Sequence, residues 1–127
     1  SAKEQEHLMQ DAQKKKREGI KTALGWLYEK FPACFNPKDL KPLKLKIDKD
    51  LYLLLKQEGA PSKSQLRDAL AYYTRNIDYL KTVINGKHRY DLEGQQMQEI
   101  TQDQIDFAQE KLEKILQAIK GKKSHKK

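Results

Sequence analysis

A cationic segment that also carries tyrosines has the residue types best suited to binding chemistry in this chain. The segment begins at Ser62 and reads SKSQLRDALAYYTRNIDYL. Ser62 followed by Gln65 is the pattern of a capping box, which predicts the start of a helix. Lys63 and Arg67 then lie near that helix N-terminus, where free N–H groups and the helix dipole favour anions over cations. An anionic ligand would relieve the repulsion, although both side chains could instead be solvated, with Asp68 offsetting their charge.

The same region of the chain offers aromatic rings and a second group of cations. Tyr72, Tyr73 and Tyr79 follow at helical spacing, and we expect Tyr73 to be buried and Tyr79 to be more available to a ligand. Lys87 and Arg89 alternate with ring-bearing residues in KHRYDL, so a strand would place both cations on one face. Basic side chains near an aromatic ring are what a protein needs to follow a phosphate backbone and stack bases.

Histidine and cysteine do not have the spacing of a catalytic or metal site. The three histidines, at positions 7, 88 and 125, are far apart in the sequence. Cys34 is the only cysteine, so the chain has no internal disulfide and no Cys-rich zinc site. Because Cys34 lies among Phe and Pro residues, we expect a buried and inert thiol.

Two pairs of carboxylates could in principle perform acid–base chemistry. Helix capping explains Asp48 with Asp50, and a hairpin turn explains Asp91 with Glu93. No glycine-rich phosphate loop is present. We therefore predict a protein that is not an enzyme and needs no metal or cofactor.

The charge of the chain is high and unevenly distributed. A formal charge of +8 and a pI near 9.5 favour a polyanionic partner. Residues 38–89 carry twelve Lys or Arg against six Asp or Glu, residues 91–119 carry two against seven, and residues 120–127 carry five Lys. The fold should therefore present a basic middle, a basic tail and an acidic last helix.

Membrane insertion and export are not expected. The sequence has no apolar stretch of the roughly 20 residues that span a bilayer, and its first residues are too polar for a signal peptide. A cytoplasmic protein with no membrane partner is the prediction.

Apolar periodicity predicts a mainly α-helical domain of about five helices with a small β-hairpin. We expect this domain to span residues 19–119, between a polar basic arm or frayed helix at residues 1–18 and a flexible lysine-rich tail at residues 120–127. No apolar stripe is left over for a partner copy, so a monomer is expected.

The predicted elements follow from local signals. The first packed helix begins at Gly19 and stops before Pro32, and a short helix capped by Asp48 runs to Lys56. One apolar stripe continues from Leu66 to Leu80 and predicts a single helix there. Later signals are a hairpin turn at residues 93–94, a capping box of Thr101 and Gln104, and a last helix that ends at Gly121.

Four motifs in this order and spacing resemble one known family. They are FPACF, KPLKLKI, SKSQLRDALAYYTRNIDYL and HRYDLEGQ. They resemble the ProQ/FinO domain of bacterial RNA chaperones, over a stretch from about Ala23 to Leu116. The chain is similar to the short members of this family that consist of little but the domain.

The resemblance implies a concave face that holds the 3′ end of a terminator-like RNA hairpin with a single-stranded tail. It also implies protection of RNA 3′ ends and promotion of pairing between small or antisense RNAs and their targets. The family's concave-face cations, pocket tyrosine and hairpin acids would be Lys44, Lys63, Arg67, Arg89, Tyr79, Asp91 and Glu93, the acids accepting hydrogen bonds from ribose hydroxyls. Arg75 and Lys46 are basic where relatives are often neutral, and with Lys87 they complete the candidate RNA contacts.

Other partners remain open at this point. Basic surface could bind an acidic protein or DNA, and a lysine-rich tail could bind a lipid surface. A lipid-binding helix would need exposed bulky apolar residues, whereas these stripes are needed for the core.

Overall fold

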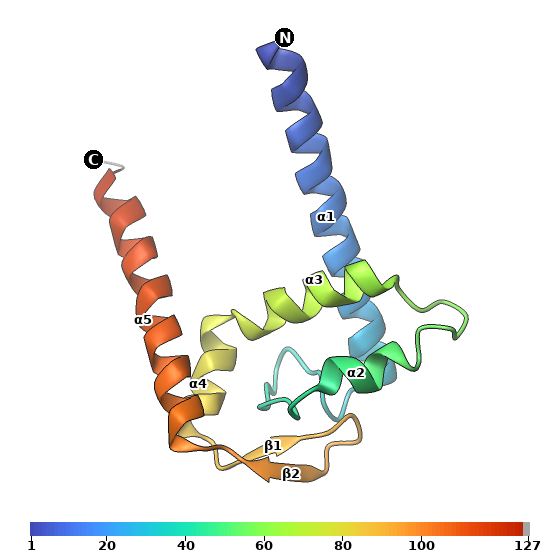
Figure 1. The fold of residues 1–127 in the computed structure, drawn as a ribbon, viewed down its shortest axis with the longest axis vertical. Coiled ribbons are helices and arrows are strands. Elements are labelled where there is room, and N and C mark those ends of the chain that lie inside the picture. The colour runs from blue at the N-terminus through green and yellow to red at the C-terminus, as the bar shows by residue number, and fades with distance from the viewer. Residues whose placement is uncertain (126–127) are drawn as a thin grey trace.

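The computed structural model describes residues 1–125 as five α-helices and one β-hairpin (Figure 1). In chain order the elements are α1 (Ala2–Lys30), α2 (Ile47–Tyr52), α3 (Lys63–Thr74), α4 (Ile77–Asn85), β1 (His88–Tyr90), β2 (Gln96–Glu99) and α5 (Gln102–His125). Figure 1 shows α1 and α5 projecting from the same side of a body formed by the shorter elements. The predicted fold class, mainly α with a small hairpin, is confirmed.

The core lies where the C-terminal half of α1 packs against α3 and the loop that follows α1. Its largest fully buried side chains are Leu27, Phe35, Leu51, Leu66 and Cys34. Phe35 meets the buried ring of Tyr73 edge-on, with ring centroids 5.3 Å apart. The expectation that Tyr73 is a core residue is therefore confirmed.

Helix α1 begins earlier than predicted. It starts at Ala2, capped by a reciprocal hydrogen-bonded pair of Ser1 and Glu4, and residues 1–18 are exposed at every position. Gly19 is the first buried residue. The predicted boundary thus marks where core contact begins rather than where the helix begins.

Helix α2 differs from its prediction at both ends. Asp48 is not the cap: Lys46 precedes the helix with a left-handed backbone (φ 64°) and makes no side-chain cap hydrogen bond. The earlier start places both Ile47 and Leu51 in the core. Packing against the rest of the domain therefore decides where this helix begins, and a local capping preference does not include that packing. The helix ends at Tyr52, well before the predicted Lys56.

The single helix predicted across residues 62–80 is two helices. The capping box at Ser62 is confirmed and starts α3, but α3 ends at Thr74. Asn76 then caps α4, because its side-chain oxygen accepts hydrogen bonds from the N–H groups of Asp78 and Tyr79 at 2.8 and 3.4 Å. Tyr79 therefore lies on α4, and the prediction that it shares a helix with Tyr73 is wrong.

The hairpin packs beside the segment that precedes α2. Strands β1 and β2 are antiparallel, with His88 opposite Glu99 and Tyr90 opposite Gln96. Leu43 pairs with Tyr90 in a parallel bridge. The segment around Leu43 thus extends the small sheet, which is too short to be stable alone.

The last helix begins as predicted and ends later. The N–H of Gln104 donates to the Thr101 hydroxyl, and the Thr101 N–H donates to the Gln104 side chain, each at 3.2 Å. Helix α5 then passes through Gly121 and reaches His125, so the predicted end at Gly121 is wrong. Residues 126–127 of the predicted flexible tail lie outside the described residues. Within the described part, no helix has the length and apolar character needed to cross a membrane.

We expect two Gly-to-Ala substitutions to have opposite effects on stability. Gly94 has a φ of +80°, and a Cβ there would lie 3.0 Å from the Ala33 carbonyl oxygen. Gly94→Ala should therefore lower the free energy of unfolding by about 1–2 kcal/mol or more. Gly25 is exposed within α1, and a Cβ there would meet no described atom within 4 Å. Gly25→Ala should raise the same quantity by about 0.5–1 kcal/mol. Urea denaturation measures both, and equal effects would contradict the assigned hairpin turn.

Candidate functional site

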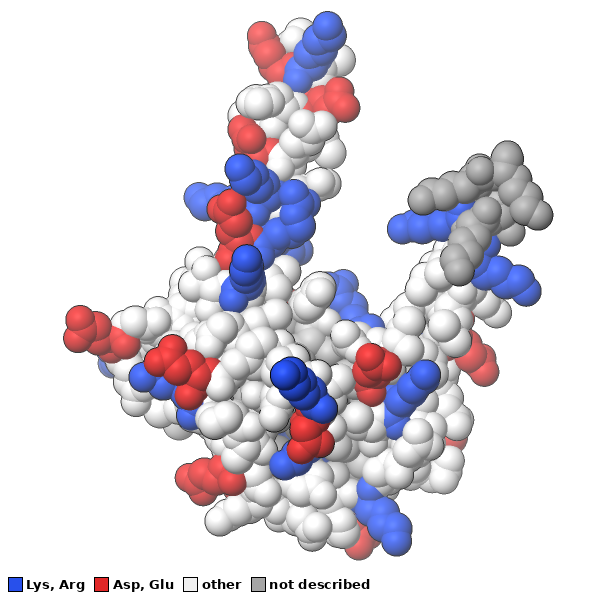
Figure 2. All heavy atoms as spheres, turned by 180° about the vertical axis from the view of Figure 1, so that it is seen from behind, with Lys and Arg blue, Asp and Glu red and all other residues white. Residues whose placement is uncertain are grey.

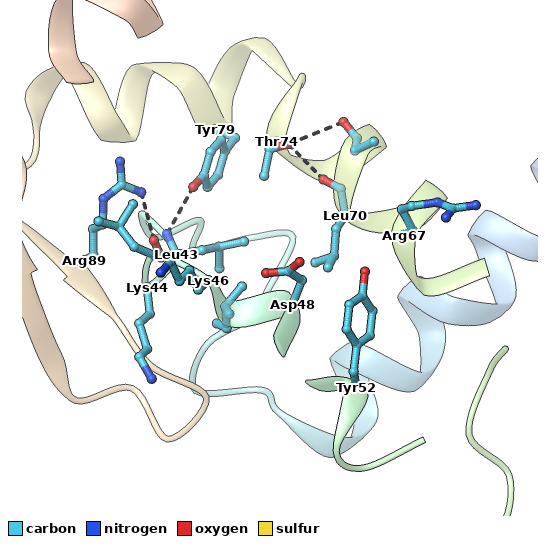
Figure 3. Close-up of a pocket in the computed structure, with 13 residues that line it drawn as sticks. Leu43, Lys44, Lys46, Asp48, Tyr52, Arg67, Leu70, Thr74, Tyr79 and Arg89 are labelled. Atoms are coloured by element: carbon cyan, nitrogen blue, oxygen red, sulfur yellow. Dashed lines mark hydrogen bonds between the residues drawn. The ribbon is translucent and has the colours of Figure 1, made fainter. Parts of the chain in front are cut away.

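The backbone N–H and carbonyl of Leu43 hold two side chains from distant elements (Figure 3). Its neighbours pair with β1, since the Lys44 N–H donates to the Tyr90 carbonyl and the Tyr90 N–H donates to the Pro42 carbonyl, both at 2.8 Å. The N–H of Leu43 donates to the Tyr79 hydroxyl oxygen at 3.1 Å, and its carbonyl accepts from Arg89 Nη1 at 2.9 Å. The backbone of one residue, Leu43, therefore fixes a tyrosine from α4 and an arginine from β1.

Tyr79, which we expected to be more available to a ligand than Tyr73, is also a buried residue. Only 5% of it is exposed. Burial raises the pKa of its phenol, and the Leu43 N–H and the Arg89 guanidinium partly offset that rise. The hydroxyl is therefore neutral near neutral pH, and after accepting from Leu43 it keeps its own hydrogen for a ligand.

Arg89 connects the hairpin to the start of α5. Its Nη2 donates to the side-chain oxygen of Gln104 at 3.3 Å, and Gln104 also belongs to the capping box of α5. The buried Nε–H of Arg89 has no hydrogen-bond acceptor among the described residues. Because a guanidinium carries five N–H donors, the contacts to Leu43 and Gln104 leave further donors available.

Tyr79 and Arg89 line a hollow of about 310 Å³, which we call the Leu43 hollow. Its other lining residues are Leu43, Lys44, Leu45, Lys46, Ile47, Asp48, Tyr52, Arg67, Leu70, Ala71 and Thr74. Its charged lining consists of four cations and a single carboxylate, Asp48, within the described chain. The positive charge of Lys44 is partly neutralised, because its ammonium lies 2.8 Å from the carboxylate of Asp50. The hollow remains a cationic site of a size suited to a small ligand or a terminal nucleotide.

A second hollow of about 370 Å³ adjoins the first, since Thr74, Tyr79 and Arg89 line both. Helix α5 contributes Phe107, which is 67% exposed, and the Lys111 ammonium lies 5.9 Å from the centre of its ring. Sequence reasoning did not select Phe107. One feature of the sequence could have found it: Phe107 does not belong to the apolar stripe of α5, so its large ring is not needed in the core.

Lys63 and Arg67 occupy different places around the Leu43 hollow. Arg67 lines it, at the end away from Arg89 (Figure 3). Lys63 is not a lining residue, but its ammonium lies 4.7 Å from the ring centre of Tyr52, which is one. The helix N-terminus therefore contributes cations to the rim of the site.

The other predicted contacts lie outside this hollow. Arg75 donates from Nε to a carbonyl at the end of α3 at 3.1 Å, and Lys87 is exposed just before β1. Asp91 accepts two backbone N–H groups of the hairpin turn at 2.9 Å each, and Glu93 is exposed. A contact of these four residues with RNA stays a prediction.

Cys34 is buried as expected. It is 1% exposed, and burial, followed by the charge of Asp91, raises the pKa of its thiol to about 12. Across the described residues, no three His, Cys, Asp or Glu side chains gather closely enough to hold a metal ion.

Comparison with known proteins identifies the family. The model of the ProQ/FINO family matches residues 4–125. The chain belongs to the ProQ/FinO family. This match covers all the helices and strands described above except the first two residues of α1, and it confirms the resemblance found in the sequence motifs.

The relatives in the ProQ/FinO family include curated proteins and solved structures. A protein named RNA chaperone ProQ from Shewanella piezotolerans is 42% identical over 79% of this chain and 48% of its own length. One from Pseudoalteromonas atlantica is 44% identical over 73% of this chain and 44% of its own length. The chain thus spans about half the length of the curated relatives it matches.

Two solved structures share the fold. A FinO-like RNA chaperone from Neisseria meningitidis is 28% identical, with a TM-score of 0.63 over 78% of this chain and 80% of that one. A ProQ homolog from Legionella pneumophila is 29% identical, with a TM-score of 0.61 over 72% of this chain and 79% of that one.

The Tyr79 hydroxyl should be important for stability as well as for the site. Tyr79→Phe leaves the buried N–H of Leu43 without its acceptor, so the free energy of unfolding should fall by about 1–3 kcal/mol. Tyr72→Phe removes a hydroxyl from a ring that is 54% exposed and should change stability by less than about 0.5 kcal/mol. Urea denaturation of both variants tests this, and a Tyr79→Phe variant as stable as the parent would contradict the contact.

The Cys34 thiol should react slowly in the folded protein. Because it is buried and protonated, a thiol-specific disulfide reagent at mildly alkaline pH should modify it only when the domain opens. The absorbance of the released thiolate measures the rate, and concentrated guanidinium chloride should make the reaction fast. Complete labelling of native protein within the mixing time would show that Cys34 is accessible.

Proposed function

We propose that this chain is an RNA-binding domain that acts as an RNA chaperone. It takes the 3′ end of a structured hairpin, with its single-stranded tail, into the Leu43 hollow. The observation that carries the proposal is the pair of donors, Tyr79 and Arg89, both held by the backbone of Leu43 beneath a cationic rim. Membership of a family whose relatives are named RNA chaperones supports it.

The chemistry of the hollow suits the end of a strand better than a continuous duplex. Free guanidinium donors of Arg89 bind a phosphate by charge-assisted hydrogen bonds. The neutral Tyr79 hydroxyl donates to a ribose or phosphate oxygen. Lys46 and Arg67, both exposed at the rim, attract the neighbouring phosphates. A terminal nucleotide fits a hollow of about 310 Å³, whereas an RNA helix is recognised across a broad surface.

This binding mode gives the chaperone role a physical basis. An occupied 3′ end is shielded from exonucleases, and a hairpin held by its base and tail leaves its loop free to pair with another RNA. The proposal includes no catalytic step, no cofactor and no membrane partner, and it describes a cytoplasmic domain that works as a monomer.

Affinity for matched hairpins that differ only at the 3′ terminus tests the proposal. The hairpin with a 3′-hydroxyl and an unpaired tail should bind tightest. A 3′-phosphate or a deleted tail should weaken binding, because the terminal ribose no longer fits beside Tyr79 and Arg89. Fluorescence anisotropy gives the dissociation constants. Equal binding of all three RNAs would overturn the 3′-end proposal, and equal binding of a DNA hairpin would show a general nucleic-acid binder.

A charge-matched pair of variants locates the site. Arg67→Ala removes a rim cation and should weaken binding of the tailed hairpin by about 1–3 kcal/mol. Lys38→Ala removes an exposed cation that lies outside the Leu43 hollow and should have a much smaller effect. Arg89 is unsuitable for this comparison because its guanidinium also holds the Leu43 carbonyl. Equal losses in the two variants would show binding by overall charge alone.

A further inference from the structure

A third hollow, of about 340 Å³, lies between α1 and α3. We call it the α1–α3 groove, and its lining residues are Arg17, Ile20, Lys21, Leu24, Tyr28 and Tyr72. It opens on a different face of α3 from the Leu43 hollow, because successive helical residues point about 100° apart. Arg67, Ala71 and Thr74 of α3 line the Leu43 hollow, whereas Tyr72 lines the groove.

Two tyrosines give the groove its aromatic walls. Tyr72 stands on α3 with 54% of its surface exposed, and Tyr28 is half-buried on α1. The two rings line the same hollow, and burial, followed by the nearby Tyr72 phenol, raises the pKa of Tyr28. Ile20 and Leu24, one turn apart on α1, complete an apolar floor.

Cations line the α1 side of the groove. Arg17 and Lys21 are one turn apart, and Lys14 lies one further turn toward the N-terminus on the same side of the helix. All three are exposed. Figure 2 shows Lys and Arg side chains, with acidic side chains among them, on the part of α1 next to the body of the domain.

No acidic residue is among the described residues that line the groove. The nearest carboxylate on α3 by helical spacing is Asp68, one turn before Tyr72. Asp68 lines the neighbouring hollow together with Lys15 and Lys16, so two further cations face it. The charged side chains that line the groove itself are therefore two cations, Arg17 and Lys21.

We propose that the α1–α3 groove is a second RNA site, which takes an unpaired segment of RNA. A base stacks against Tyr72 and Tyr28, and the flanking phosphates contact Arg17 and Lys21. Aromatic faces beside a cationic ridge are the combination that single-stranded nucleic acid requires, and bases within a duplex do not offer their faces. The inference rests on the proposed function, and it gives one domain two RNA sites on different faces.

The experiment compares two RNAs: a tailed hairpin, and the same hairpin with an unpaired oligouridine extension at its 5′ end. Wild-type protein should bind the extended RNA tighter by about 5- to 100-fold, the range expected for one stacked base. Tyr72→Ala should remove that gain and leave the affinity for the plain tailed hairpin unchanged. Tyr72→Phe keeps the ring and should keep the gain. Leu53→Ala, which removes an exposed apolar side chain outside the groove, should behave as wild type.

Photocrosslinking supplies a second, positional readout. The extension is made with 5-iodouridine, irradiated in complex, and the adducts are mapped by mass spectrometry. Adducts on Tyr28 or Tyr72 support the inference. If the tailed hairpin binds but the extension adds no affinity, or Tyr72→Ala keeps the gain, or the adducts fall elsewhere, the second site is overturned while the proposed function stands. If wild-type protein binds neither RNA, the proposed function fails and the inference fails with it.

Discussion

The hydrogen bonds of the Leu43 backbone N–H and carbonyl are the constraint on which the site depends. Leu43 lies in the loop between α1 and α2, yet it ties two elements together: its neighbours pair with β1, its N–H meets Tyr79 of α4, and its carbonyl meets Arg89 of β1. Arg89 in turn reaches Gln104 at the start of α5. A buried backbone group that loses its hydrogen-bond partner destabilises the fold by about 1–3 kcal/mol. Moving Tyr79 or Arg89 away from Leu43 would therefore lower the stability of the domain. The donors of the site are therefore held in place before any ligand arrives.

The same arrangement explains how the Leu43 hollow combines a rigid floor, formed by Tyr79 and Arg89, with an adaptable rim that carries exposed cations. Tyr79 and Arg89 are held by backbone and α5 contacts, whereas Lys46 and Arg67 are exposed around the opening. Fixed donors discriminate between ligand termini, because a poorly matched end leaves buried polar groups unpaired. Flexible cations contribute affinity through charge without fixed geometry. The aromatic α1–α3 groove lies on another face of α3, so the RNA segment proposed for it would not compete with a ligand in the Leu43 hollow.

Local patterns in the sequence predicted local features well. The capping boxes at Ser62 and Thr101 start helices as predicted, because a cap needs only residues within one turn. The apolar stripe from Leu66 to Leu80 concealed the break at Asn76, although that residue type is itself a good cap. The contacts of Leu43 could not be predicted, since they join residues 36 and 46 positions apart through the backbone of a loop. The family resemblance named Tyr79 and Arg89 as site residues, but not their burial or what holds them.

The most direct test of the central claim is an NMR titration of the labelled protein with the tailed hairpin. It follows the backbone amide of Leu43, which donates to Tyr79, and the Nε–H of Arg89, which belongs to the guanidinium that donates through Nη1 to the Leu43 carbonyl. The account predicts that these two signals shift strongly with the 3′-hydroxyl RNA and less with the 3′-phosphate RNA. Strong RNA binding that leaves both signals in place, with shifts confined to the exposed half of α1 or to α5, would contradict it.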